Sequence, residues 1–271
     1  MKNAKVLTIS QSIHPFLETP EMANAARHLP QGLLEGGNEI RVFMPKFGCI
    51  NERRHQLHEV IRLSGMNLII NDTDHALLIK VASVPNVRMQ VYFIDNEEYF
   101  KRKSTWAAKD GSFHKDNDER ALFFCRGVLE TVRKLGWVPD IIHCHGWMTS
   151  FVPLYIRHKF ADDPHFENAK LVYSVYDEKP EALDKDMTKK LALEGFPEEL
   201  LKDLKKPTTE DLYKFGMSLS DAVVKGSPKL SKGLEGVIKS VDKPVLESPS
   251  EDELVALHTE FYQSILEEAL V

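Results

Sequence analysis

The first 45 residues alternate between two kinds of hydrophobic pattern, and this alternation restricts the fold more than any other feature of the sequence. A short β-branched run at residues 4–10 is typical of a buried strand. Apolar residues then recur at helical spacing over residues 21–35, where a glycine pair ends the pattern. A second strand-like run follows at residues 38–45. A strand, a helix and a strand in succession predict an α/β fold with a doubly wound, mostly parallel sheet.

The pattern changes at residues 57–94, where short strand-like runs are separated by turn residues with no room for helices. We expect this stretch to form an antiparallel insertion. Further along, Asp118 is a candidate N-cap for a helix that ends at Gly136. The elements expected after it are a strand at 140–145, a helix at 149–160, a strand at 170–176, a short strand at 222–224 and a helix opened by Ser227 and Pro228. Pro30 is expected to interrupt the first helix.

The C-terminal residues predict a separate helix. Pro244 and Pro249 indicate a linker, and Ser250 with Glu253 forms a capping box ahead of an apolar stripe. The stripe consists of Leu254, Leu257, Phe261 and Ile265, through which we expect the helix at 251–270 to pack on the rest of the protein. The chain thus divides into a domain over residues 1–245 and a C-terminal helix over residues 250–271.

Charge and composition exclude several classes of protein. Hydrophobic residues make up 42% of the chain and the net charge is −6, which fits a folded core and argues against a nucleic-acid binder. The three cysteines form no CxxC pair, which favours a reducing compartment. No apolar run is long enough for a signal peptide or a membrane span, so we expect a cytoplasmic protein without membrane partners.

Ligands of open α/β sheets bind beyond the carboxyl ends of the strands, which here means the loops after Ser10, His145, Tyr176 and Val224. A loop that binds phosphate exposes backbone N–H groups and is rich in glycine. The loop at residues 10–22 has no glycine and carries Glu18 and Glu21, so a capped helix entry is favoured over a nucleotide site.

Two histidines of the strand expected at residues 140–145 suggest a metal site as one hypothesis. His143 and His145 are two residues apart on a strand and therefore lie on one face, as in the first ligand pair of some metal-dependent hydrolases. Asp177 and Glu178 are the nearby groups that could complete a site, but a hydrogen-bonded pair at the end of the sheet is favoured. We therefore expect no metal and no cofactor, and Cys144 is expected in the core.

A basic run lies beside aromatic residues. Lys101, Arg102 and Lys103 precede Trp106, and this mixture suits the recognition of sugars, phosphates or acidic partners. The alternative is a solvated insertion loop, because most charged runs are solvated.

Seven segments of the sequence resemble, in order and spacing, the N-terminal domain of bacterial glycogen synthases and plant starch synthases, which are retaining glucosyltransferases that use ADP-glucose. The segments are KVLTIS, Pro15, HLPQGLLEGGNEIRVFMPKFG, VYFID, PDIIHCHGWMTSFVPLYI, KLVYSVY and DAVVKGSPKLSKGL, and the resemblance covers roughly residues 3 to 240. It implies a single Rossmann-like domain, one half of a two-domain glycosyltransferase fold. The family's second domain, which bears most nucleotide contacts and the catalytic acid, is expected to be absent.

The departures from the family fall on its chemistry. Where the family has Lys-Thr-Gly-Gly-Leu, this chain has Glu18 to Met22, and where it has His-Asp-Trp-His, this chain has His145 to Met148. The family's Val-His-Asn becomes Val175-Tyr176-Asp177, which places Tyr176 at the histidine that contacts the donor glucose. No catalytic residue is assigned. The resemblance implies a ligand-binding cleft at Glu18, Thr19, Trp106, His145, Gly146, Trp147 and Tyr176.

Three functions follow as hypotheses. The first is a glycogen/starch synthase-type domain that has lost autonomous glucosyl transfer and binds α-glucan or a protein partner of glycogen metabolism, as a scaffold or regulator. The second is a glucosyltransferase that uses ADP-glucose, or a similar ligand, with its other half supplied by another chain. The third is a metal-dependent hydrolase built on His143 and His145.

Overall fold

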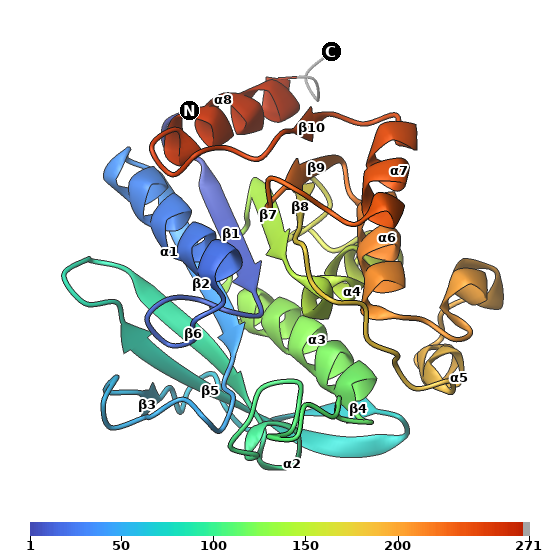
Figure 1. Ribbon diagram of the computed structural model, residues 1–271. Helices are drawn as coiled ribbons and strands as arrows, with labels where there is room; N and C mark the ends of the chain where they lie inside the picture. The colour runs from blue at the N-terminus through green and yellow to red at the C-terminus, as the bar shows by residue number, and fades with distance from the viewer. Residues whose placement is uncertain (268–271) are drawn as a thin grey trace.

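A parallel sheet forms the centre of the molecule in the computed structural model, which describes residues 1–267 (Figure 1). Its strand order is β10-β9-β8-β7-β1-β2-β6-β5-β3, with β4 paired to β5. The strands from β10 to β6 all pair in parallel. Their bounds are β1 (Lys5–Ser10), β2 (Glu39–Pro45), β6 (Gln90–Asp95), β7 (Ile141–His145), β8 (Lys170–Val175), β9 (Ala222–Lys225) and β10 (Val245–Leu246). The predicted doubly wound sheet is confirmed.

An antiparallel extension is attached to one edge of this sheet. The long strand β5 (Thr73–Ser83) runs antiparallel to β6, and β3 (His58–Glu59) and β4 (Met66–Ile70) both pair with β5. The expected insertion at 57–94 therefore includes one strand too many, because β6 also pairs in parallel with β2. A strand's own sequence does not reveal the direction of its neighbours.

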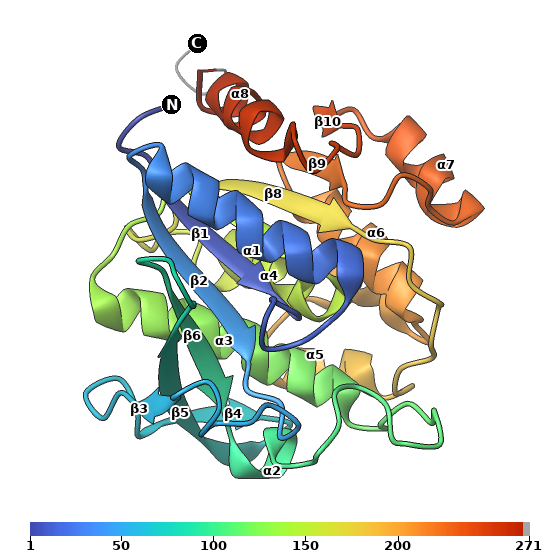
Figure 2. The same ribbon diagram turned by 60° about the vertical axis from the view of Figure 1, so that its left-hand side comes forward.

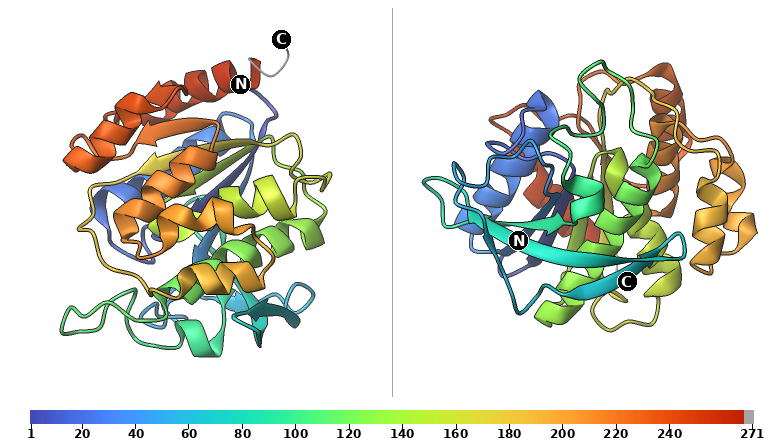
Figure 3. Two further views of the ribbon diagram at one scale, coloured as in Figure 1. Left: turned by 90° about the vertical axis from the view of Figure 1, so that its right-hand side faces the viewer. Right: turned by 90° about the horizontal axis from the view of Figure 1, so that it is seen from below.

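Helices cover both faces of the sheet, as the side view in Figure 3 shows. On one face, α1 (Pro20–Glu35) and α8 (Leu254–Glu267) pack on Val6, Ile141 and Val172. On the other face lie α3 (Asn117–Leu135), α4 (Phe151–Leu154) and α6 (Thr209–Leu219). The remaining helices are α2 (Glu97–Phe100), α5 (Met187–Leu193) and α7 (Lys232–Ser240), with a 3₁₀ turn at Trp147–Thr149, a π turn at Tyr155–Lys159 and a 3₁₀ segment at Glu198–Leu204. None of the described helices is long and apolar enough to cross a bilayer.

Three details of the helices differ from expectation. Helix α1 continues through Pro30. The residue before α3 is Asp116, so the predicted N-cap Asp118 is wrong, and its side chain accepts a hydrogen bond from Lys190 instead. Helix α7 begins at Lys232 and is capped by Ser231, so Ser227 and Pro228 belong to the preceding loop.

Helix α8 contacts α1, and Figure 2 shows α8 above α1. A Cβ on Gly32 would come within 2.4 Å of a Val255 methyl group, so the close approach depends on this glycine. The buried positions of α8 are Leu254, His258, Tyr262 and Ile265, whereas Leu257 and Phe261 of the predicted stripe are half-buried. Ser250 donates to Glu253 Oε2 at 2.6 Å, but the helix starts only at Leu254. Residues 268–271 of the predicted helix lie outside the described residues, and the domain boundary at 245–250 stays a prediction.

Candidate functional site

The switch point of the sheet lies beside β1, because β2 flanks it on one side and β7 on the other. Gln11 follows β1 at this point and joins two loops. Its Oε1 accepts the Met148 N–H at 3.0 Å, and its Nε2 donates to Glu178 Oε1 at 3.0 Å. Gly146 has φ +90° and a Cβ there would meet Gln11 Oε1 at 2.4 Å. The glycine at this position therefore makes room for Gln11.

A group of buried histidines and tyrosines lies at the ends of β7 and β8. The rings of His143 and His145 are 3.9 Å apart, as expected for two residues on one face. His145 Nδ1 is 2.7 Å from the Tyr176 hydroxyl. His143 contacts the Tyr262 hydroxyl through Nδ1 at 2.6 Å and Ser174 Oγ through Nε2 at 2.7 Å. Helix α8 thus supplies one of the partners.

Burial keeps these imidazoles neutral. Desolvation lowers the pKa of His145 to about 3 and that of His143 well below its usual value. Both ring nitrogens of His143 are occupied by hydrogen bonds, so this residue has no free lone pair for a metal ion. Among residues 1–267, no group of three or more His, Cys, Asp or Glu side chains is arranged to hold a metal. The geometry gives the hydrolase hypothesis no support.

Tyr176 is buried against a glycine. A Cβ on Gly226 would lie 2.3 Å from Cε1 of the Tyr176 ring, so this ring fits here because position 226 has no side chain. Burial also raises the pKa of the Tyr176 hydroxyl, which therefore stays protonated and can donate a hydrogen bond.

The close contact of Gly226 with Tyr176 predicts that one methyl group added at position 226 destabilises the fold. We expect Gly226→Ala to lower the free energy of unfolding by roughly 1–3 kcal/mol, the usual cost of overpacking a buried contact. Urea denaturation should show a smaller loss in a Tyr176→Ala background, where the ring is absent. Gly236→Ala is the matched control, because nothing lies within 4 Å of that position in α7. Equal losses in both backgrounds would contradict the contact.

Two of the predicted cleft residues line one hollow. A space of about 230 Å³, which we call the aromatic hollow, is bounded by Trp106, Phe113, Trp147, Glu178, Glu181 and Thr209, with Ala107, Gly111 and Lys179. The rings of Phe113 and Trp147 are 5.5 Å apart. Trp147 is 2% exposed, whereas Trp106 is half-buried and offers more of its surface. Aromatic rings beside carboxylates and a hydroxyl are chemistry suited to a polyhydroxylated ligand.

A second hollow adjoins the first at Glu178. This second space of about 380 Å³, which we call the loop hollow, is lined by Thr19, Glu21, Met22, Tyr176, Asp177 and Glu178. Glu21 accepts a hydrogen bond from Ser227, and Glu178 accepts from Gln11 and Tyr213. Desolvation raises the pKa of Glu178 to about 7, although these hydrogen bonds oppose the rise. Above pH 7 the hollow therefore carries three carboxylates.

The other predicted residues are distributed around these hollows. Glu18 is exposed on the loop before α1, and Gly146 lies beneath the site against Gln11. His145 is buried and lines a different pocket, between α1 and α8. The predicted recognition patch is only partly free: Arg102 pairs with Asp116, Lys101 is exposed and pairs with Glu97 at 3.4 Å, and Lys103 is exposed.

Several residues that line the hollows or contact a residue of their lining were not predicted from the sequence. Gln11 directly follows a buried strand, and that position was a usable signal. Phe113 could have been noticed with Trp106 as a second aromatic residue of the same loop. Glu181 and Thr209 come from segments without a recognisable pattern, and they meet because Thr209 N–H donates to the Glu181 carbonyl at 2.9 Å.

Comparison with known proteins supports the resemblance. The family model described as the starch synthase catalytic domain matches residues 5–239. A glycogen synthase of Chlorobium limicola is 40% identical over 176 residues, which cover 65% of this chain and 36% of that protein. A glycogen synthase of Chlorobium phaeovibrioides is 36% identical over 241 residues, covering 87% of this chain and 48% of that protein. The chain thus spans about half, or less, of the length of these relatives.

A solved structure shares the fold. The catalytic domain of starch synthase IV from Arabidopsis thaliana, bound to ADP and acarbose, superposes with a TM-score of 0.75 at 19% identity. The match covers 91% of this chain and 51% of that one.

Proposed function

The chain belongs to the family of the starch synthase catalytic domain, and from this premise we propose that it binds α-glucan and does not transfer glucose from ADP-glucose by itself. The single observation that carries the proposal is the pairing of an aromatic hollow with an acidic one at the carboxyl ends of the parallel strands.

The acidic loop hollow disfavours a nucleotide sugar. Glu21 and Asp177 are exposed and line this space, and Glu178 adds a third carboxylate when ionised. A diphosphate would be repelled by these groups, and it would need cations or backbone N–H donors to bind. None of the described residues that line this hollow is a lysine or an arginine. Neutral sugar hydroxyls, in contrast, can donate to each of these carboxylates.

The aromatic hollow favours the glucan. A pyranose ring packs its C–H face against an aromatic ring, and its hydroxyls reach polar groups at the rim. Here the half-buried Trp106 supplies the ring, while Glu178, Glu181 and Thr209 supply the rim. The starch synthase IV neighbour is bound to acarbose, which supports a ligand of this class.

Titration with maltoheptaose tests this proposal. We expect saturable binding by calorimetry and a change in tryptophan fluorescence, and we expect Trp106→Ala to weaken binding about tenfold through the lost stacking. Trp137→Phe is the matched control, because Trp137 precedes β7 and lies at the opposite end of the sheet, where Nε1 donates to Glu39. The proposal is wrong if the unmodified chain does not bind, or if both variants weaken binding equally.

A second function is supported by the comparisons. The relatives are glycogen synthases of which this chain spans 36% and 48%, so glucosyl transfer with the remaining half supplied by another chain is the alternative. Exposed Lys101 and Lys103 are available to contact such a partner of glycogen metabolism. A transfer assay with ADP-glucose distinguishes the two functions, because only the second predicts activity when the other half is present.

A further inference from the structure

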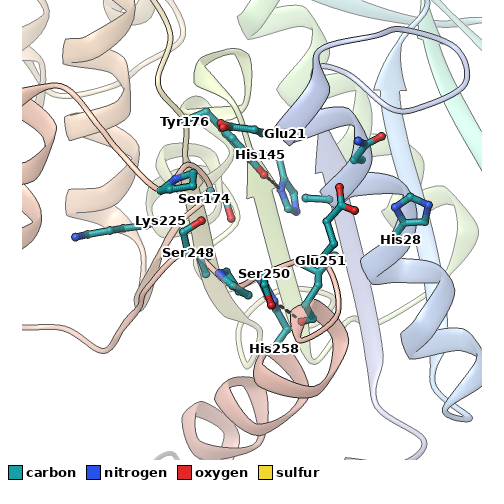
Figure 4. Close-up of a pocket in the computed structure, with 17 residues that line it drawn as sticks. Glu21, His28, His145, Ser174, Tyr176, Lys225, Ser248, Ser250, Glu251 and His258 are labelled. Atoms are coloured by element: carbon teal, nitrogen blue, oxygen red, sulfur yellow. Dashed lines mark hydrogen bonds between the residues drawn. The ribbon is translucent and has the colours of Figure 1, made fainter.

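A third pocket, of about 290 Å³, lies between α1, the ends of β8 and β9, and the segment that leads into α8 (Figure 4). We call it the α1–α8 pocket and define it by Asn24, His28, His145, Lys225, Glu251 and His258. It shares Glu21 and Tyr176 with the loop hollow, whereas the walls of the aromatic hollow are different residues. The ring and the rim proposed for α-glucan, Trp106 with Glu178, Glu181 and Thr209, lie outside it.

His145 leaves one polar atom without a partner in this pocket. The side chain is 1% exposed, and Nδ1 contacts the Tyr176 hydroxyl. Nε2 has no hydrogen-bond partner within the described part of the chain. Buried polar atoms are nearly always paired, because an unpaired one loses its hydration without compensation. A ligand that pairs with Nε2 would remove this cost.

His258 presents a hydrogen-bond acceptor to the same pocket. Its Nδ1 lies 2.8 Å from the Leu254 carbonyl oxygen, which only accepts, so Nδ1 must carry the proton. Desolvation lowers the pKa of His258 to about 4, so the ring is neutral near pH 7 and Nε2 carries a lone pair. Figure 4 shows His258, His145 and the Glu251 side chain arranged around one space, each from a different segment.

The electrostatic balance of the pocket favours a cation. Lys225 is the one lysine or arginine among the described lining residues, and it pairs with Glu235 at 3.1 Å and Glu247 at 3.0 Å. Its side chain extends away from the pocket in Figure 4. Glu21 and Glu251 then remain as unbalanced negative charges in the lining, while Ala25, Val224 and Leu254 supply apolar surface.

We propose that the α1–α8 pocket binds a small primary amine with a short aliphatic body. The ammonium donates to the Glu251 carboxylate and to the imidazole lone pairs of His258 and His145, and the aliphatic part packs on the apolar surface. Binding selects the His145 tautomer in which Nδ1 donates to Tyr176 and Nε2 accepts. Carboxylates and phosphates are repelled, and an alcohol has one donor where an ammonium has three.

An isosteric ligand series tests the proposal on the full chain. We expect n-butylammonium to bind with a dissociation constant on the order of millimolar. 1-Butanol should bind at least about tenfold more weakly, since charge-assisted hydrogen bonds are lost, and butyrate should not saturate. In protein labelled with ¹⁵N-histidine, the Nε2 resonances of His145 and His258 should shift with n-butylammonium. Unchanged imidazole resonances at saturation, or butanol binding as tightly, would overturn the proposal.

Two neighbouring acidic residues supply the matched variants. Glu251→Gln should weaken n-butylammonium binding about tenfold, because a direct charge-assisted contact is lost. Asp252→Asn removes the same charge from an exposed neighbour outside the lining and should change binding less than about twofold. Equal losses in the two variants would mean general electrostatic attraction and no site. Trp106→Ala should leave amine binding unchanged, which separates this inference from the glucan proposal.

Discussion

Lys190→Met is expected to lower the free energy of unfolding by about 3–5 kcal/mol at pH 8, the usual cost of removing one partner of a buried ion pair. Lys190 Nζ lies 2.7 Å from Asp118 Oδ2, 2.8 Å from Glu119 Oε1 and 3.2 Å from Asp184 Oδ2. The Lys190 side chain is 8% exposed and that of Asp118 is fully buried. Without the ammonium, Asp118 would be left as an uncompensated buried charge between α3 and α5.

The pH dependence of this loss has a definite sign. Desolvation raises the pKa of Asp118 to about 6, above its ordinary value, even though Lys190 opposes the rise. The hydrogen bonds and charges of Asp118 and Glu119 raise the pKa of Lys190 despite desolvation, so the lysine stays charged. An acid whose pKa is higher in the folded than in the unfolded protein stabilises the fold while it is protonated. For Asp118 this contribution is complete at pH values below its ordinary pKa, and it is lost as pH rises through about 6. The deficit of Lys190→Met should therefore be largest above pH 6 and should shrink towards pH 4, where Asp118 becomes neutral.

Urea denaturation at pH 8 and pH 5 measures both effects. Lys189→Met is the matched control, because Lys189 is the next residue and its side chain is 79% exposed. Its pairing with Asp186 should contribute less than about 0.5 kcal/mol, as surface ion pairs usually do. A deficit that is equal for the two lysines, or that grows as pH falls, would contradict the buried network.

The second large effect concerns the nucleotide sugar. We expect the chain alone to transfer no glucose from ADP-glucose to glycogen above a boiled control, because each missing preorganised group costs about 10²–10³ in rate. ADP-glucose should also fail to saturate the protein in calorimetry, since Glu18 and Glu21 put negative charge beside the start of α1. Transfer that Tyr176→Phe abolishes would support the alternative function instead.

A charge change in the loop makes this prediction more specific. Glu18→Lys combined with Glu21→Gln should raise the affinity for ADP at least about tenfold, because repulsion is replaced by attraction at a helix N-terminus. Glu198→Lys combined with Glu199→Gln introduces the same charge at two exposed residues of the 3₁₀ segment and serves as the control. If both pairs raise ADP affinity equally, the loop is not a nucleotide site in any form.

Local patterns predicted most of the sheet and failed where a partner is distant in sequence. The runs at residues 4–10 and 140–145 were recognisable because buried parallel strands are continuously apolar. Asp118 looked like a helix cap by its position alone, but its partner Lys190 is 72 residues away. The expected insertion at 57–94 included β6 together with β3, β4 and β5, because the parallel pairing of β6 with β2 depends on a neighbour that no local pattern describes.

The candidate site divides in the same way. Sequence patterns alone predict that the loops after Ser10, His145 and Tyr176 lie at the carboxyl ends of parallel strands, and that the first of these loops is acidic and lacks glycine. The folded protein adds the contact of Gln11 with Glu178 across 167 residues and that of Tyr262 with His143 across 119. The physical reason is that periodicity reports which face of an element is buried, whereas hydrogen bonds and pockets depend on which distant side chains meet that face.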